Sequence, residues 1–129
     1  MTIIGHKLID YPKFFRALKV ADVHNSSPKD IVLACGEGRE GLWKFLCDNR
    51  VTYATEALSI RDAVILNALK ATYIVVSNRE LAESIQQVAN EYLFDSKILL
   101  AIEHEEQIEE CAKLGIDGVI YKGVIDGEF

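Results

Sequence analysis

The sequence predicts an α/β domain with a five-stranded parallel sheet, and three observations support this prediction. Short apolar runs rich in β-branched residues alternate with longer segments whose apolar residues recur at helical spacing. The connections between these segments are short. A glycine-rich turn leads from the first core strand, residues 31–35, directly into a helix. We therefore expect a three-layer α/β/α arrangement, with right-handed crossovers and helices on both faces of the sheet.

Length and charge narrow the class of protein. The chain has 129 residues, which suits one domain, and its net charge of −6 argues against a nucleic-acid partner. No apolar run approaches the length of a membrane span, and the N-terminus lacks the features of a signal peptide. The three cysteines, Cys35, Cys47 and Cys111, are far apart and suit free thiols in a reducing compartment. These features predict a cytoplasmic protein with no direct membrane insertion.

Residues 1–29 differ from the rest and are expected to form an N-terminal arm. Ile3 and Ile4 suit a short strand. Asp10, as an N-cap, and Pro12, in the first turn, predict a short helix over residues 10–20. Residues 24–29 contain polar residues and a proline, which is typical of a linker.

Residues 30–129 carry the predicted sheet domain. Apolar, β-favouring runs predict the strands, and amphipathic spacing predicts the helices between them. The expected strands are residues 31–35, 51–55, 73–76, 98–102 and 118–121, and the expected helices are 42–47, 58–69, 80–93 and 105–114. Ser59 suits an N-cap and Gly115 a C-cap. In such a sheet, ligands bind beyond the carboxyl ends of the strands.

The turn after residue 35 has the spacing Gly36-x-Gly38-x-x-Gly41, which makes the first unit Rossmann-like. Gly36 would allow the tight turn, Gly38 a close approach to a pyrophosphate, and Gly41 close packing of the helix on the strand. The predicted cofactor-binding residues here are Gly36, Glu37, Gly38, Arg39 and Gly41. The alternative is a glycine-rich turn that binds nothing, because Glu37 and Glu40 place negative charge where phosphates would lie.

Further candidate residues follow the next two strands. Glu56 lies twenty residues after Gly36, at the distance of the acid that binds ribose hydroxyls in dinucleotide sites. Ser77 and Asn78 follow the strand at 73–76 and complete the expected cofactor-binding set. NAD or another adenine nucleotide is the expected ligand, and a solvated loop carboxylate is the alternative for Glu56.

Two carboxylates also suggest a cation site. If Glu56 and Glu103 lie at neighbouring strand ends, their oxygens could hold a hard divalent cation. Catalysis has no comparable support, because the chain lacks a nucleophile elbow and a Ser/His/Asp set. We therefore expect no enzymatic activity, and Lys122 is expected to be a surface residue.

From Asp30 onward the chain resembles an RCK (TrkA-N) domain, the regulatory domain of potassium channels and transporters. The resemblance rests on Ile31-Val-Leu-Ala-Cys-Gly-Glu-Gly-Arg-Glu-Gly, on residues 62–76, on residues 97–103 and on residues 106–120. Val124-Ile-Asp-Gly resembles the exit towards the crossover helix of channel RCK domains. One helix–strand unit of the family is missing, since Asn49-Arg50 leads directly to residues 51–55.

The resemblance implies a regulatory N-lobe that forms a homodimer and, in some assemblies, a gating ring. A ligand in the cleft would shift the angle between subunits and so act on a potassium channel or transporter. Carboxylates at the positions of Glu56 and Glu103 belong to the divalent-cation site of calcium-gated relatives. The chain would then be the cytosolic part of an inner-membrane protein, or an N-lobe standing alone.

Two other classes stay open at this point. A pseudo-receiver, a signalling and interaction module without phosphorylation, fits the same rhythm of elements, with Lys122 as its final-strand lysine. A small nucleotide-dependent enzyme is the third class. In the receiver order, and in an RCK order shortened by one unit, the strand at 31–35 lies between those at 51–55 and 73–76.

Overall fold

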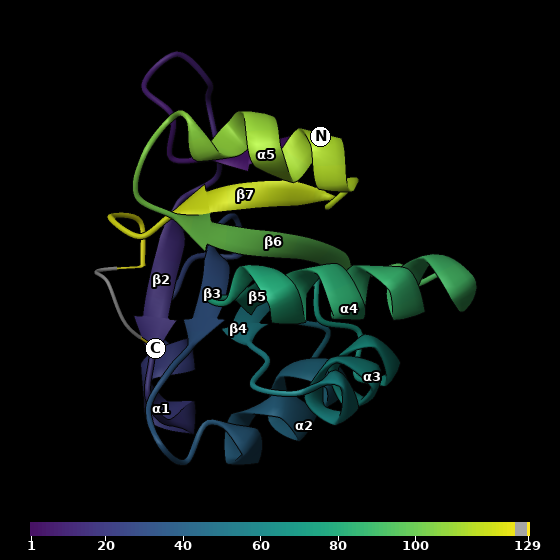
Figure 1. Ribbon diagram of the computed structural model, residues 1–129. Coiled ribbons are helices and arrows are strands. Elements are labelled where there is room, and N and C mark those ends of the chain that lie inside the picture. The colour runs from purple at the N-terminus through teal and green to yellow at the C-terminus, as the bar shows by residue number, and fades with distance from the viewer. Residues whose placement is uncertain (126–128) are drawn as a thin grey trace.

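The computed structural model describes residues 1–125 and 129. Within them, seven parallel strands form one sheet that curves into a half-barrel (Figure 1). The strands are β1 (Thr2–Ile4), β2 (Phe14–Ala17), β3 (Ile31–Ala34), β4 (Tyr53–Glu56), β5 (Tyr73–Val76), β6 (Lys97–Ile102) and β7 (Gly118–Tyr121). The helices are α1 (Val20–Val23), α2 (Glu40–Asp48), α3 (Ile60–Ala68), α4 (Arg79–Glu91) and α5 (Gln107–Leu114). The parallel α/β class is confirmed, but the predicted number of five strands is wrong.

The strands follow one another across the sheet in the order β1-β7-β6-β5-β4-β3-β2. Each crossover from β2 to β7 therefore steps in the same direction along the sheet. Right-handed crossovers that all step the same way place their helices on one face. The buried apolar residues of every helix belong to one cluster, so the predicted layer of helices on each face is wrong.

The order also changes the neighbours of the glycine-loop strand. β3 pairs with β2 and β4, whereas β5 pairs with β4 and β6. The expectation that β3 lies between β4 and β5, shared by the shortened RCK order and the receiver order, is therefore wrong. β2, which lies within residues 1–29, occupies the edge of β3 that β5 was expected to take.

Residues 1–29 are an integral part of the sheet, not a separate arm. β1 pairs with β7 and β2 pairs with β3. The helix expected over residues 10–20 is wrong, because residues 10–13 are not helical, Phe14–Ala17 pair with β3 as an edge strand, and α1 begins only at Val20. Pairing with β3 and half-burial of both phenylalanines outweigh their helical spacing.

The concave face of the half-barrel is packed with apolar side chains. Its cluster draws on successive strands and on buried Ile125, with Phe129 packed against it. The concave face is thus a core and not an open channel. Asp126 and Gly127, which the resemblance places at an exit from the domain, lie outside the described residues.

Other local predictions agree with the structure. The Ser59 side chain caps α3 by accepting from the Asp62 amide at 3.1 Å. Gly115 ends α5 with a left-handed φ of 74°. Cys35, Cys47 and Cys111 are free thiols, and burial raises the pKa of Cys111. No helix in the described part of the chain is long and apolar enough to cross a membrane.

Candidate functional site

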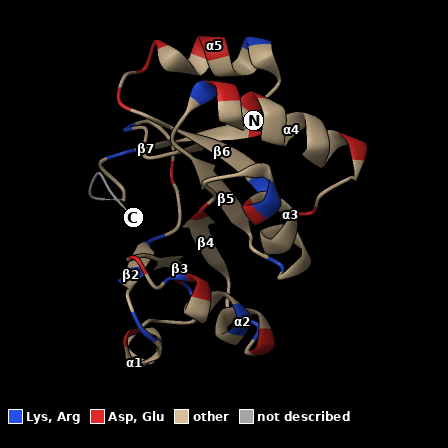
Figure 2. Ribbon diagram, turned by 60° about the horizontal axis from the view of Figure 1, so that its bottom comes forward, with Lys and Arg blue, Asp and Glu red and all other residues tan. Residues whose placement is uncertain are grey.

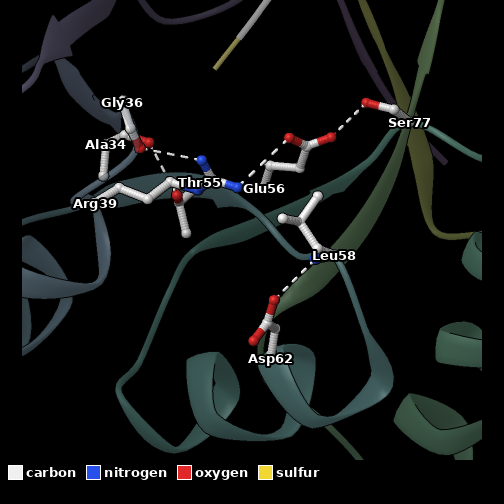
Figure 3. A network of polar contacts seen from close by, with 8 residues as sticks. All are labelled: Ala34, Gly36, Arg39, Thr55, Glu56, Leu58, Asp62 and Ser77. Carbon is white, nitrogen blue, oxygen red and sulfur yellow. Dashed lines mark hydrogen bonds and ion pairs between the residues drawn. The ribbon is translucent and has the colours of Figure 1, made fainter.

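Polar side chains meet where β3, β4 and β5 end, and Arg39 and Glu56 lie at their centre (Figure 3). Arg39 Nη1 donates to the Gly36 carbonyl at 3.1 Å, and its Nη2 lies 3.7 Å from Glu56 Oε1. Ser77 Oγ donates to the other Glu56 oxygen at 2.6 Å. The Arg39 and Glu56 side chains are only 12% and 15% exposed. The glycine loop, Glu56 and Ser77 of the predicted set are therefore brought together at one edge of the sheet.

The glycine loop leaves several main-chain donors unused. Gly36 has a φ of 91°, so the turn requires a residue that tolerates this conformation. The Arg39 and Gly41 amides donate within the turn, to Gly36 and Gly38. Among the described residues, the amides of Glu37, Gly38 and Glu40 find no acceptor. Free amides at the start of a helix are the usual setting for an anion.

Gly38 and Gly41 have different surroundings from those expected. A Cβ built at either position meets no atom within 4 Å. The predicted role of Gly41, close packing of α2 on the strand, is wrong because α2 buries Leu42, Trp43 and Leu46 while Gly41 faces solvent. No contact of the described chain explains a glycine at position 38 either.

Arg39 has hydrogen-bond donors that its contacts do not use. Its Nε is buried and has no hydrogen-bond partner. A guanidinium carries five N–H donors, and the geometry above uses few of them.

Glu56 is less available than the sequence suggested. Its two carboxylate oxygens already contact Arg39 and Ser77. A ribose hydroxyl would share this carboxylate with the Arg39 guanidinium and the Ser77 hydroxyl. Asn78 has a structural role, because its Oδ1 accepts from the Leu81 amide at 2.8 Å and caps α4.

The two carboxylates of the predicted cation site are not neighbours. Glu56 ends β4, Glu103 follows β6, and β5 lies between them. Two strand spacings amount to roughly 10 Å. Lys122 Nζ also donates to Glu103 at 2.9 Å, and this contact holds the pKa of Glu103 below its usual range. Among the described residues no three His, Cys, Asp or Glu side chains gather as a metal site.

The sequence patterns did not predict a second polar cluster on this edge. His6, just after β1, contacts Glu105 through Nε2 at 3.0 Å. Its Nδ1 accepts from the Leu8 amide at 3.1 Å, so the Nε2 proton is the one that binds Glu105. This contact lowers the pKa of Glu105, and with Tyr121 the pair lines a cavity of about 260 Å³. The strand predicted at Ile3–Ile4 could have indicated this cluster, because it places His6 just beyond the carboxyl end of a strand.

The other charges near this edge are mostly acidic. Glu105, Glu106, Glu109 and Glu110 gather at α5 and the turn before it (Figure 2). Arg79 at the start of α4 pairs with Glu110 and Glu80, and these contacts raise the pKa of Arg79. Arg39 lies within the glycine loop and is therefore the cation best placed to hold an anionic ligand there.

The chain matches no known family model and no curated protein.

Proposed function

We propose that this chain is a non-catalytic, ligand-binding regulatory domain that holds the phosphate of an adenine nucleotide at Gly36–Arg39. The observation that carries this proposal is the set of free amides at Glu37 and Gly38, in the turn before α2, and at Glu40, its first residue. A phosphate there would accept hydrogen bonds from these amides and attract the positively charged Arg39 guanidinium. The site lies at the carboxyl end of the sheet, where parallel α/β domains bind their ligands.

Gly38 adds a second argument. A side chain at this position would have open space around it, so packing does not demand glycine. A ligand that approaches the backbone closely does demand it. The open space beside Gly38 is thus the space that a phosphate would fill.

The charges of the loop predict weak binding. Glu37 and Glu40 are exposed and lie on either side of Gly38 in sequence. Their repulsion opposes a highly charged ligand. We therefore expect AMP and NAD, with fewer charges, to bind more tightly than ATP.

Regulation of a potassium channel or transporter, through a homodimer, is the finer form of this proposal. It rests on the resemblance of the loop and of the later segments to RCK domains. The sequential strand order differs from the order expected for that family, and it differs equally from the receiver order. The strand order therefore does not favour an RCK domain over a pseudo-receiver. Identification of a bound ligand would discriminate between these two classes better.

Calorimetric titration with NAD, NADH, ATP and AMP tests the proposal. We expect Gly38→Ala to weaken binding about tenfold or more, as loss of close contact with a charged group would, without lowering the melting temperature. The matched control is Gly123→Ala, since Gly123 also has open space for a Cβ. Absence of binding by the wild type, or equal binding by Gly38→Ala, would refute a phosphate site at the loop.

A further inference from the structure

The opposite edge of the sheet, where the strands begin, carries a group of basic side chains. Arg50 and Lys70 follow α2 and α3, and Lys97 begins β6. Among the described residues none of the three forms an ion pair. By contrast, Arg39, Arg79 and Lys122 on the carboxyl edge are all paired with glutamates. Other cations of the described residues, such as Lys7 and Lys29, also form no ion pair, so what distinguishes these three is their arrangement around shared cavities.

Two cavities lie among these cations and share Lys70. One, of about 310 Å³, is lined by Arg50, Lys70 and polar neighbours such as Thr52. The other, of about 650 Å³, is lined by Lys70, Lys97 and Asp95. Asp48, which lines the first cavity, is already paired with Lys44. Three cations therefore face one unpaired carboxylate, Asp95, across two adjoining cavities.

Neutral donors complete the lining of the larger cavity. Thr2 and Thr72 supply hydroxyl groups. Asn67 uses its Oδ1 to accept from the Ser96 amide at 3.2 Å, which leaves its NH₂ group as a donor. Hydroxyl, amide and ammonium donors around a hollow are the chemistry that binds phosphate or carboxylate groups.

The backbone at two of these cations is unfavourable for a side chain. Arg50 has a φ of 55° and Lys70 a φ of 62°, the left-handed region where glycine is preferred. The same position after α5 is Gly115. A helix carboxyl end favours nearby cations in general, but a lysine in the last turn meets that preference without a left-handed backbone. Leu93 adopts the same conformation after α4 and lines neither cavity, so this backbone is a way of ending the helices and does not by itself indicate ligand binding.

We propose that this edge is a second anion site, which takes a small molecule with two anionic groups, such as a bisphosphate. One group lies between Arg50 and Lys70, and the other between Lys70 and Lys97. Asp95 accepts a hydroxyl of the same molecule. The site is separate from the glycine loop, which lies at the other end of the strands.

Titration with pyrophosphate and with fructose 1,6-bisphosphate as probes, at low salt, tests the second site. Lys70→Gly removes the shared cation and also relieves the left-handed backbone, so it should raise the melting temperature and weaken binding about tenfold or more. Leu93→Gly is the matched control, because Leu93 is left-handed at φ 54° and lines neither cavity. It should raise the melting temperature and leave binding unchanged.

Two results would overturn the second site. The wild type could bind neither probe at millimolar concentration, and binding of a polyglutamate peptide through Lys70 in that case would identify an acidic protein partner instead. Alternatively, Lys70→Gly could bind both probes as tightly as the wild type. Unchanged probe binding by Gly38→Ala is expected and keeps the test separate from that of the glycine loop.

Discussion

At Arg50, Lys70 and Leu93 the backbone is left-handed although the side chains are not those of glycine. Each follows a helix whose end is closed by a bond from the next amide, as in Val51 N to Leu46 O at 3.0 Å. The same closure after α5 uses Gly115. These three helix ends therefore carry an unfavourable backbone conformation. A single substitution to or from glycine at such a position changes the free energy of unfolding.

Leu93→Gly should raise the free energy of unfolding by about 0.5–1 kcal/mol, because relief of the left-handed backbone exceeds the entropy that glycine adds to the unfolded chain. Gly115→Ala should lower it by about 1 kcal/mol. A Cβ at Gly115 meets no atom within 4 Å, so backbone conformation alone accounts for this loss. Urea denaturation of both variants measures the difference, and effects of the same sign would contradict it.

Lys122→Met should raise the pKa of Glu103 towards its usual value, since the hydrogen bond and charge of Lys122 hold it down. A lowered pKa in the folded state stabilises the protein above the unfolded pKa, and this contribution is lost as pH falls through the folded value. The variant should therefore lose less stability in acid than the wild type. Carboxyl NMR titration measures the pKa, with Lys113→Met as control; no rise in the pKa of Glu103 would refute the pairing.

At the scale of elements, β1 depends on one glycine in its neighbour. A Cβ at Gly118 would collide with the Thr2 carbonyl and come within 2.8 Å of Leu99 Cδ2. Gly118 is also the partner of Thr2 in the β1–β7 register. Close approach of the two backbones therefore requires glycine at this position.

Gly118→Ala should detach β1 and destabilise the fold by about 1–3 kcal/mol, the range for overpacked cores. Hydrogen exchange should show loss of protection at Thr2–Ile4, while β4 and β5 keep theirs. Gly123→Ala is the control, since its Cβ has open space. Retained protection at β1 would show that the strand adapts and would contradict this prediction.

The elements show where sequence patterns succeed and fail. The strands from β3 to β7 and the helices between them were predicted because their apolar spacing is set by burial against one sheet. β2 was missed because Phe14, Phe15 and Leu18 have helical spacing and Asp10 and Pro12 resemble a helix start. Its pairing with β3 is a tertiary contact, and no local pattern encodes it.

At the scale of the whole molecule, strand order could not be predicted from the alternation of strands and helices. The same alternation gives helices on both faces when crossovers reverse direction, and on one face when they do not. The residues of the glycine loop were predicted, since their signal is local. The contacts of Glu56 with Arg39 and Ser77 were not, because they depend on the order of β3, β4 and β5.

The most direct test of anion binding at the glycine loop is a ¹H–¹⁵N NMR titration of the uniformly labelled chain with AMP. We predict saturable shifts at the amides of Glu37, Gly38 and Glu40, with smaller changes near Ser77 and none at Lys70. Loss of these shifts in Gly38→Ala would agree with the result expected from calorimetry. Shifts absent from the loop at saturating AMP, or confined to other parts of the chain, would contradict binding at this site.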